Sequence, residues 1–414
     1  MDFEDTPEEA AFRKQVREWL AANAPRRGES VAGDELADRT DKAFLTAAKA
    51  WQARKAEAGY ARITWPKEVG GFGGTPIQQV IFSQEEGKIK ALDGLGGPFA
   101  IGLGMCIPTV MTYCGKEVLA RYVKPALHGQ EIWCQLFSEP AGGSDVAGLR
   151  TRAERKGDEW LINGQKIWTT GAQISDFGIL LTRTDPNVPK HKGLTMFIVD
   201  MHDPAVDVRP IKQASGASGF NEVFFTDLKV KDSMRVGDIG DGWRVALTTL
   251  MHERLAVGGG QGGGLDVPQL LQLARDLELE DGPALRNAAV REKIADWYVR
   301  SAGLKYTTYR TMTALSRGQQ PGPEASIAKI VVAAKLQDLT AYATELEGEL
   351  GSLKGEDAPL GGMFQMGWLS APGLRIAGGT DEILRNIIAE RVLGLPQDIR
   401  VDKDVPFNKM PSGR

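Results

Sequence analysis

The sequence predicts an α+β multidomain protein in which an N-terminal helical domain precedes a small central β-barrel or sandwich and a C-terminal helical bundle. Apolar residues recur at helical spacing up to about residue 128, short apolar runs between turn signals follow from about residue 131, and helical spacing returns beyond Gly240. We therefore expect domains at residues 1–128, 129–238 and 239–396, followed by a polar surface tail at 397–414.

The N-terminal domain begins with a helix that either Asp5 or Thr6 can cap. A second helix is expected from about Lys42 to Ala58, and a glycine-rich loop at residues 65–74 separates it from further helical pattern. The predicted buried stripes are Phe12, Val16, Trp19 and Leu20 in the first helix and Phe44, Leu45, Ala48 and Trp51 in the second.

The strongest turn signal of the central domain is Asn163-Gly164, which lies between two apolar runs and is typical of a two-residue hairpin turn. We therefore predict a hairpin over residues 159–168. Short, evenly spaced strands are typical of a small barrel or sandwich, and the further predicted strands are 177–182, 194–200, 206–211 and 222–230.

The C-terminal domain contains five stretches of helical periodicity, at residues 243–253, 268–277, 283–315, 324–346 and 382–393. On the first of these helices, Trp243, Ala246, Leu247 and Leu250 form the predicted buried stripe. At about 100° per residue, Glu253 falls on the edge of this stripe and His252 on the opposite side.

The charge balance excludes several classes of partner. The 414 residues include 50 Lys and Arg against 54 Asp and Glu, a net charge of −4, so we expect no nucleic-acid partner and no basic face for anionic lipid. Glycine is abundant, with 49 residues, but 42% apolar residues and nine Trp indicate packed cores rather than low complexity.

The cysteines, histidines and termini point to a cytoplasmic protein. Three Cys without paired spacing and four scattered His predict neither a disulfide framework nor a metal site. The acidic, amphipathic N-terminus does not resemble a secretory signal, and no apolar run reaches the length of a membrane span.

Two segments of the central domain combine glycine, hydroxyl and aromatic residues as ligand sites do. Residues 133–145 are either a plain loop entering a strand or a place where a planar ligand lies against bare backbone. Residues 166–172 contain Trp168, which is either a core residue or an aromatic contact to that ligand.

Two further segments lie in the C-terminal domain. Glu253 is either paired with an arginine such as Arg254 or kept as a base of raised pKa. Thr380 is a good N-cap, and the preceding Gly378 and Gly379 suggest a ligand close to the helix start. Residues 258–263 match G-x-G-x-x-G, but no strand precedes them, so we expect no dinucleotide-binding fold there.

Taken together and in this order, the four segments resemble the acyl-CoA dehydrogenase family over about residues 5–396. The resemblance implies FAD as cofactor, an acyl-CoA thioester as substrate and an electron-transferring flavoprotein as electron acceptor. It implies flavin contacts from Gln135, Phe137, Ser138, Ser144, Trp168, Thr170, Thr380 and Glu382, and substrate contacts from Ser144, Gly378 and Gly379.

The catalytic base is expected at Glu253. Many members of the family carry the base at the position of Gly378, which has no side chain here, and others carry it at the position of Glu253. Six glycines between 258 and 264 follow this residue, and we expect them to end or loosen the helix and enlarge the acyl pocket.

Two departures from the family pattern affect the part of the flavin site that a neighbouring subunit completes. The usual Arg-x-x-Phe-Gly is reduced to Arg275 without Phe-Gly, and residues 364–368 match the glycine-rich segment only loosely. The chain is therefore expected to be a homo-oligomer (dimer or tetramer) or a heteromer of the kind associated with bulky or steroid acyl-CoAs. A flavin-poor half-site subunit and an oxygen-using acyl-CoA oxidase are the alternatives.

Overall fold

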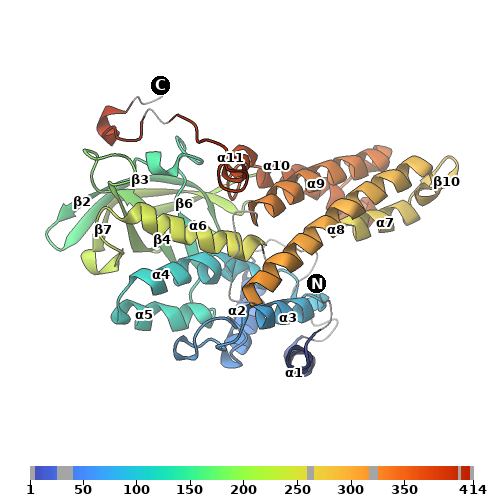
Figure 1. Ribbon diagram of the computed structural model, residues 1–414, viewed down its shortest axis with the longest axis horizontal. Coiled ribbons are helices and arrows are strands. Elements are labelled where there is room, and N and C mark those ends of the chain that lie inside the picture. The colour runs from blue at the N-terminus through green and yellow to red at the C-terminus, as the bar shows by residue number, and fades with distance from the viewer. Residues whose placement is uncertain (1–4, 26–40, 259–264, 317–324, 400–401, 411–414) are drawn as a thin grey trace. The chain divides into compact units, whose positions relative to one another are not determined.

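The computed structural model describes residues 5–25, 41–258, 265–316, 325–399 and 402–410 (Figure 1). The chain divides into two compact units. The larger unit comprises Asp2–Gln213, Ala217–Ala256 and Asp398–Arg414, and the smaller unit comprises Ala214–Gly216 and Val257–Gln397. The helix–β–helix order along the chain confirms the predicted fold class.

The N-terminal helices of the larger unit are α1 (Pro7–Asn23), α2 (Lys42–Glu57), α3 (Pro76–Glu86), α4 (Ile107–Tyr113) and α5 (Lys116–Leu127). Thr6, not Asp5, caps α1, because its hydroxyl accepts from the Glu9 N–H at 3.2 Å while the Glu9 carboxylate accepts from the Thr6 N–H at 2.8 Å. The predicted stripes of the first two helices are buried or partly buried in one core.

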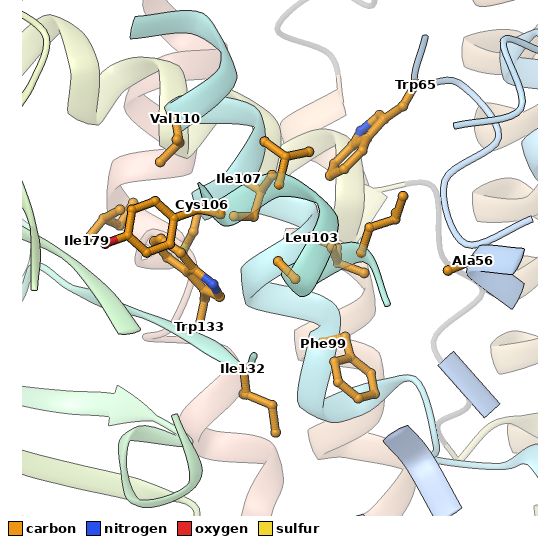
Figure 2. Packing of buried hydrophobic residues seen from close by; sticks show 14 of the residues in the cluster. Ala56, Trp65, Phe99, Leu103, Cys106, Ile107, Val110, Ile132, Trp133 and Ile179 are labelled. Atoms are coloured by element: carbon orange, nitrogen blue, oxygen red, sulfur yellow. The ribbon is translucent and has the colours of Figure 1, made fainter. Parts of the chain in front are cut away.

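That core continues into the β domain. Figure 2 shows Ile132 and Trp133, at the start of β1 (Trp133–Leu136), beside Phe99, Leu103 and Cys106 of the helical segment. Trp133 is fully buried. The helices and one face of the sheet are therefore stabilised by the same apolar cluster, which keeps β1 fixed relative to α4.

The larger unit contains an eight-stranded sheet. Its strand order is β6-β7-β3-β2-β4-β5-β8, and β1 pairs in parallel with β4. Besides β1, the strands are β2 (Arg152–Lys156), β3 (Glu159–Thr170), β4 (Phe177–Arg183), β5 (Leu194–Asp200), β6 (Val206–Ile211), β7 (Phe220–Lys231) and β8 (Arg235–Val236).

The predicted hairpin at Asn163-Gly164 is wrong. These residues lie inside the single long strand β3, which pairs along β7 with a shift in register between Ile162 and Gly164. The Asn163 side chain bonds across to Asp227 instead of closing a turn. The actual two-residue turn lies one strand earlier, at Gly157-Asp158 between β2 and β3, so pairing with β7 overrides the local turn preference.

Helix α6 (Gly242–Gly258) follows the sheet. The predicted buried stripe is only partly correct, because Leu247 is 45% exposed while Val245, Ala246 and Thr249 are buried. Thr249 bonds to Thr109 of α4 through their hydroxyls at 3.0 Å. Packing against α4 therefore rotates the buried face of α6 away from Leu247.

The smaller unit contains α7 (Val267–Asp276), α8 (Ala288–Ser316), α9 (Ala325–Leu346), α10 (Met363–Leu374) and α11 (Asp381–Arg391), with a short pair of strands, β9 (Glu278–Leu279) and β10 (Gly282–Pro283). Leu270, Trp297, Leu339 and Phe364 are in its core. Helix α10 is not predicted by the sequence pattern, because its flanking Gly361 and Gly362 and its internal Pro372 are loop signals. Among the described residues, no helix is long and apolar enough to cross a membrane.

Candidate active site

The loop after β1 lies directly against the end of β3. The Ile167 N–H of β3 donates to the carbonyl oxygen of Ser138 at 2.9 Å. Gln135 is half-buried on β1, whereas the Phe137 side chain is buried in the core, so only the backbone of Phe137 is available to a ligand. The two predicted central-domain segments thus meet in the larger unit.

A buried ion pair joins these segments. The Lys166 ammonium, which is fully buried, donates to the Glu139 carboxylate at 2.8 Å and to the Phe137 carbonyl oxygen at 3.0 Å. The same carboxylate accepts from the backbone N–H groups of Arg150 at 2.6 Å and Thr151 at 2.9 Å. One carboxylate therefore holds both ends of the loop 139–151 and the strand β3.

The pKa values of the pair follow from its burial. Burial lowers the pKa of Lys166 to about 8, although the Glu139 carboxylate opposes this shift. Burial would raise the pKa of Glu139, but the charge and hydrogen bond of Lys166 bring it below its ordinary value. The sequence pattern does not predict the Glu139–Lys166 ion pair. Its only signal is that Lys166 lies on a predicted strand two residues before Trp168.

Trp168 is not a core residue. Its side chain is 56% exposed, and its backbone has φ +60°, a conformation that costs a non-glycine residue free energy. It lies at the irregularity in β3–β7 pairing between Lys166 and Thr169. Phe220 contacts the ring edge-on at 6.1 Å between centroids. The bulge turns the indole out of the sheet, where it offers an accessible aromatic surface next to the exposed Thr170.

Ser144 follows a tight turn that carries the loop back on itself. Glu139 and Gly142 exchange two backbone hydrogen bonds, of 2.9 and 3.1 Å, and Ser144 is exposed immediately after. Beyond Ser144 the loop is held by Arg183, whose guanidinium donates to the carbonyl oxygens of Ala147 at 2.6 Å and Leu149 at 3.1 Å.

Residues of the C-terminal segment contact Lys190 and Arg183, the two side chains that hold this loop. Lys190 pairs with Asp145 at 3.1 Å and with Asp402 at 2.7 Å. The Phe407 ring lies 3.5 Å from the Arg183 guanidinium, and the Phe407 N–H donates to the Val188 carbonyl oxygen at 2.9 Å. Figure 1 shows this end of the chain beside the β strands. The predicted surface tail is thus a docked segment over residues 402–410.

The smaller unit holds the predicted C-terminal site residues at the start of α11. Gly378 and Gly379 have φ of +65° and +89°, a conformation that favours glycine. Thr380 caps α11, since its hydroxyl accepts from the Ile383 N–H at 3.2 Å, and Lys329 donates to the Gly379 carbonyl oxygen at 2.7 Å. Glu382 is exposed in the first turn. The start of α11 offers the positive end of a helix dipole, which suits an anionic ligand.

Glu253 lies on α6, and its side chain is outside the described residues, as are residues 259–264 of the glycine run. The preceding His252 is half-buried rather than turned to solvent, which corrects the predicted orientation. Its Nε2 atom and the Nε atom of Arg62 are buried without hydrogen-bond partners. Sequence spacing gave no signal that either atom is buried without a partner.

Within the described ranges, no group of three His, Cys, Asp or Glu side chains could hold a metal ion. Cys106, Cys114 and Cys134 are free thiols. The chemistry that the described site offers is therefore an exposed aromatic ring, hydroxyl groups and backbone amides, with cationic side chains behind them.

The comparisons with known proteins cover most of the chain. Three family models match: the acyl-CoA dehydrogenase N-terminal domain at residues 6–130, the middle domain at 134–228 and the C-terminal domain at 240–393. Acyl-CoA dehydrogenase IpdE1 of Mycobacterium tuberculosis is 35% identical over 394 residues, which is 94% of this chain and 98% of IpdE1.

Two further similarities refine this result. Acyl-CoA dehydrogenase FadE34 of Mycobacterium tuberculosis is 36% identical over 84% of this chain, and the match spans only 46% of FadE34. The solved steroid ACAD Tcur3481-Tcur3483 has a TM-score of 0.80 at 26% identity and covers 96% of this chain and 100% of its own.

Proposed function

The chain belongs to the acyl-CoA dehydrogenase family, and we propose that it desaturates an acyl-CoA thioester between the α and β carbons with Glu253 as the base. An oxidoreductase acting on acyl-CoA follows from the family itself. In the proposed reaction the Cα–H bond breaks and its proton passes to the Glu253 carboxylate. Hydride leaves the β carbon with its electron pair, and a trans double bond forms between the two carbons.

Glu253 is proposed as the base because the alternative position has no carboxylate. Gly378 has no side chain, and its φ of +65° disfavours replacement by a residue that has one. Helix α6 is anchored one turn before Glu253 by the 3.0 Å hydroxyl contact between Thr249 and Thr109. This contact supports a base held on a rigid element, as general-base catalysis requires.

The exposed Trp168 carries the proposal that the larger unit binds FAD. Its outward indole, the neighbouring Thr170 hydroxyl and the backbone at Ser138 suit a planar, polar-edged ring. Gln135 on β1 and Phe137 and Ser144 in the loop that follows remain predicted contacts. Thr380 and Glu382 are the predicted contacts of the smaller unit. When bound, FAD would supply the hydride acceptor.

The decisive experiment is anaerobic flavin bleaching by a panel of short, branched, long and polycyclic acyl-CoAs. Glu253→Gln is expected to abolish bleaching while the visible spectrum and the flavin-to-protein ratio stay unchanged. Glu382→Gln changes an exposed residue in the first turn of α11, and it tests separately whether the Glu382 carboxylate contributes to flavin retention. Bleaching by Glu253→Gln at the wild-type rate would show that another group removes the proton.

The acyl group is proposed to be bulky, on the basis of the similarity to the steroid ACAD Tcur3481-Tcur3483. Polycyclic acyl-CoAs are therefore expected to bleach the flavin at lower concentration than straight-chain esters of similar carbon number. Gly378 and Gly379 are the predicted contacts to the thioester, with the Gly378 N–H as a donor to its oxygen. Equal or better bleaching by straight-chain esters would contradict this substrate class.

A heteromeric half-site subunit is the second candidate, and the smaller unit supports it. Arg275 is exposed at the end of α7 without the expected Phe-Gly. The exposed apolar residues of the smaller unit include Tyr298, Val299, Trp368, Ile376 and Leu393. A colourless protein that gains flavin absorbance only with a related subunit would favour this candidate, and a yellow homo-oligomer would exclude it.

The electron acceptor is proposed to be an electron-transferring flavoprotein. Mixing the substrate-reduced protein with such a flavoprotein under argon should reoxidise it within seconds. Rapid oxygen consumption in its absence would assign the protein to the acyl-CoA oxidases instead.

A further inference from the structure

The outward turn of Trp168 comes from a bulge in β3 that has a fixed residue on each side. Between the paired residues Lys166 and Thr169, two residues of β3, Ile167 and Trp168, oppose the single residue Glu222 of β7. Trp168 takes up the extra length with φ +60°, a conformation that costs a tryptophan free energy. The strand must therefore be held after the bulge as well as before it, or Trp168 would relax.

Asn221 of β7 holds the strand after the bulge. Its side chain is fully buried. One N–H of its amide donates to the carbonyl oxygen of Thr169 at 2.9 Å, and the other donates to the side-chain oxygen of Gln173. The Gln173 amide in turn donates to the Ser218 carbonyl oxygen at 3.0 Å. One buried amide thus connects the residue that follows Trp168 with the turn behind it.

The same turn is fixed by backbone contacts. The Gly171 N–H donates to the Gly219 carbonyl oxygen at 2.9 Å, and the Ser175 hydroxyl donates to the Gly171 carbonyl oxygen at 2.8 Å. Gly171 itself has φ +69°. Asn221 therefore anchors the end of β3 to a turn that is rigid in its own right, so movement at Thr169 is restricted.

This arrangement is not the one that stability alone would favour. Among the described residues, the Oδ1 atom of Asn221 and the Oγ1 atom of Thr169 are buried without a hydrogen-bond partner. A buried polar atom without a partner costs stability, and so does the strained backbone of Trp168. Such costs at one place are typical of functional sites, where a fixed geometry is needed.

We propose that Asn221 is a positioning residue for FAD, which holds the Thr169 carbonyl so that Trp168 stays in the left-handed conformation that turns its indole outward. This inference rests on the proposed function, in which Trp168 and Thr170 contact the flavin. Asn221 is buried and acts through the backbone of Thr169. The aromatic surface is then formed before FAD binds, so binding requires no ordering of Trp168.

The first test observes Trp168 directly. When the nine Trp are replaced by 5-fluorotryptophan, Trp168→Phe identifies the Trp168 resonance in the fluorine NMR spectrum. Asn221→Leu removes the amide at similar volume, and it should shift or broaden that resonance. Thr169→Val is the matched control, because it removes the neighbouring unpaired hydroxyl and leaves the Asn221 amide in place. It should not move the resonance. A Trp168 resonance that is unchanged in Asn221→Leu overturns the proposal.

The second test measures the coupling between Asn221 and the strained backbone, on the full chain freed of flavin by bromide dialysis. Trp168→Gly removes the strain, because glycine adopts φ +60° without penalty. Asn221→Leu should therefore lower the melting temperature by about 2–4 °C more in the Trp168→Gly protein than in the wild type, where relaxation of Trp168 offsets part of the loss. Equal losses in the two proteins would show a purely structural hydrogen bond and overturn the positioning role.

The third test measures the Kd of FAD by titration of the flavin-free proteins. Asn221→Leu should raise the Kd about 10-fold, because Trp168 must then be ordered on binding. Thr169→Val should bind FAD as the wild type does. Gln173→Met, which retains the bond between Asn221 and Thr169, should fall between them. An unchanged Kd in Asn221→Leu would overturn the role in FAD binding, even if the Trp168 resonance moves.

The two proposals fail separately in these experiments. If the wild type binds FAD and no acyl-CoA bleaches it, the desaturation is removed, and a weaker FAD affinity of Asn221→Leu still supports the positioning role. If acyl-CoA bleaches the flavin and Asn221→Leu binds FAD as tightly as the wild type, the dehydrogenase function stands and Asn221 is not a positioning residue.

Discussion

Replacing Glu139 by glutamine should destabilise the larger unit and weaken binding of the proposed flavin. The Glu139 carboxylate accepts three hydrogen bonds, from Lys166 at 2.8 Å, Arg150 at 2.6 Å and Thr151 at 2.9 Å. A glutamine accepts on one side only, so its amide N–H faces another donor. Lys166 would also remain fully buried without a counter-charge.

The magnitude follows from this loss. Removing one partner of a buried ion pair typically costs about 3–5 kcal/mol, because the other charge is left uncompensated. The double variant Glu139→Gln/Lys166→Met removes both charges, and it should recover at least half of that free energy of unfolding. Denaturant unfolding, followed by tryptophan fluorescence, measures both quantities.

Flavin content distinguishes a loss of stability of the larger unit from a loss of positioning of the loop 139–151. Both variants lose the bridge between the loop 139–151 and β3, so both should retain less flavin than the wild type, although the double variant is the more stable. A cost below about 1 kcal/mol for Glu139→Gln, or effects of the two substitutions that simply add, would refute the view that a buried pair holds the loop.

Three other predictions concern separate parts of the chain. Trp168→Gly should leave the melting temperature unchanged or slightly higher, because the side chain is 56% exposed and φ is +60°, while flavin content falls. Ending the chain at Leu395 removes the pairing of Lys190 with Asp402, and faster amide hydrogen exchange at residues 142–149 should follow. Burial raises the pKa of Glu347 to about 7, so stability of the smaller unit is full below about pH 4.5 and falls by up to roughly 3 kcal/mol as the pH rises to 7. Glu347→Gln should abolish that slope in unfolding experiments at pH 4.5 and 7.5, and an unchanged slope would contradict the assignment.

Local patterns predicted most of the secondary structure. The Thr6 cap, the apolar stripe of α1 and the strand β5 at residues 194–200 depend on residues close together in the chain. Their spacing is sufficient, because capping and burial of one face act over a single turn or strand. The four segments that resemble the family are likewise contiguous, so their order and spacing are visible without a structure.

The wrong predictions arose where contacts between residues far apart in the chain outweighed a local preference. Asn163-Gly164 favours a hairpin turn, yet pairing of β3 along the whole of β7 keeps the strand continuous. Leu247 fits the apolar stripe of α6, yet contact with Thr109 turns a different face inward. Neither competing interaction is encoded in the neighbouring residues.

The sequence alone thus determined the class of fold, the helices and strands with clear periodicity, and the candidate base on α6. Only the tertiary structure revealed that Trp168 is turned outward, that Glu139 and Lys166 join the loop to the strand, and that Arg62 and His252 leave buried nitrogen atoms unpaired. The physical reason is that burial and charge pairing depend on which residues fold together, and spacing along the chain carries no record of a partner 27 residues away.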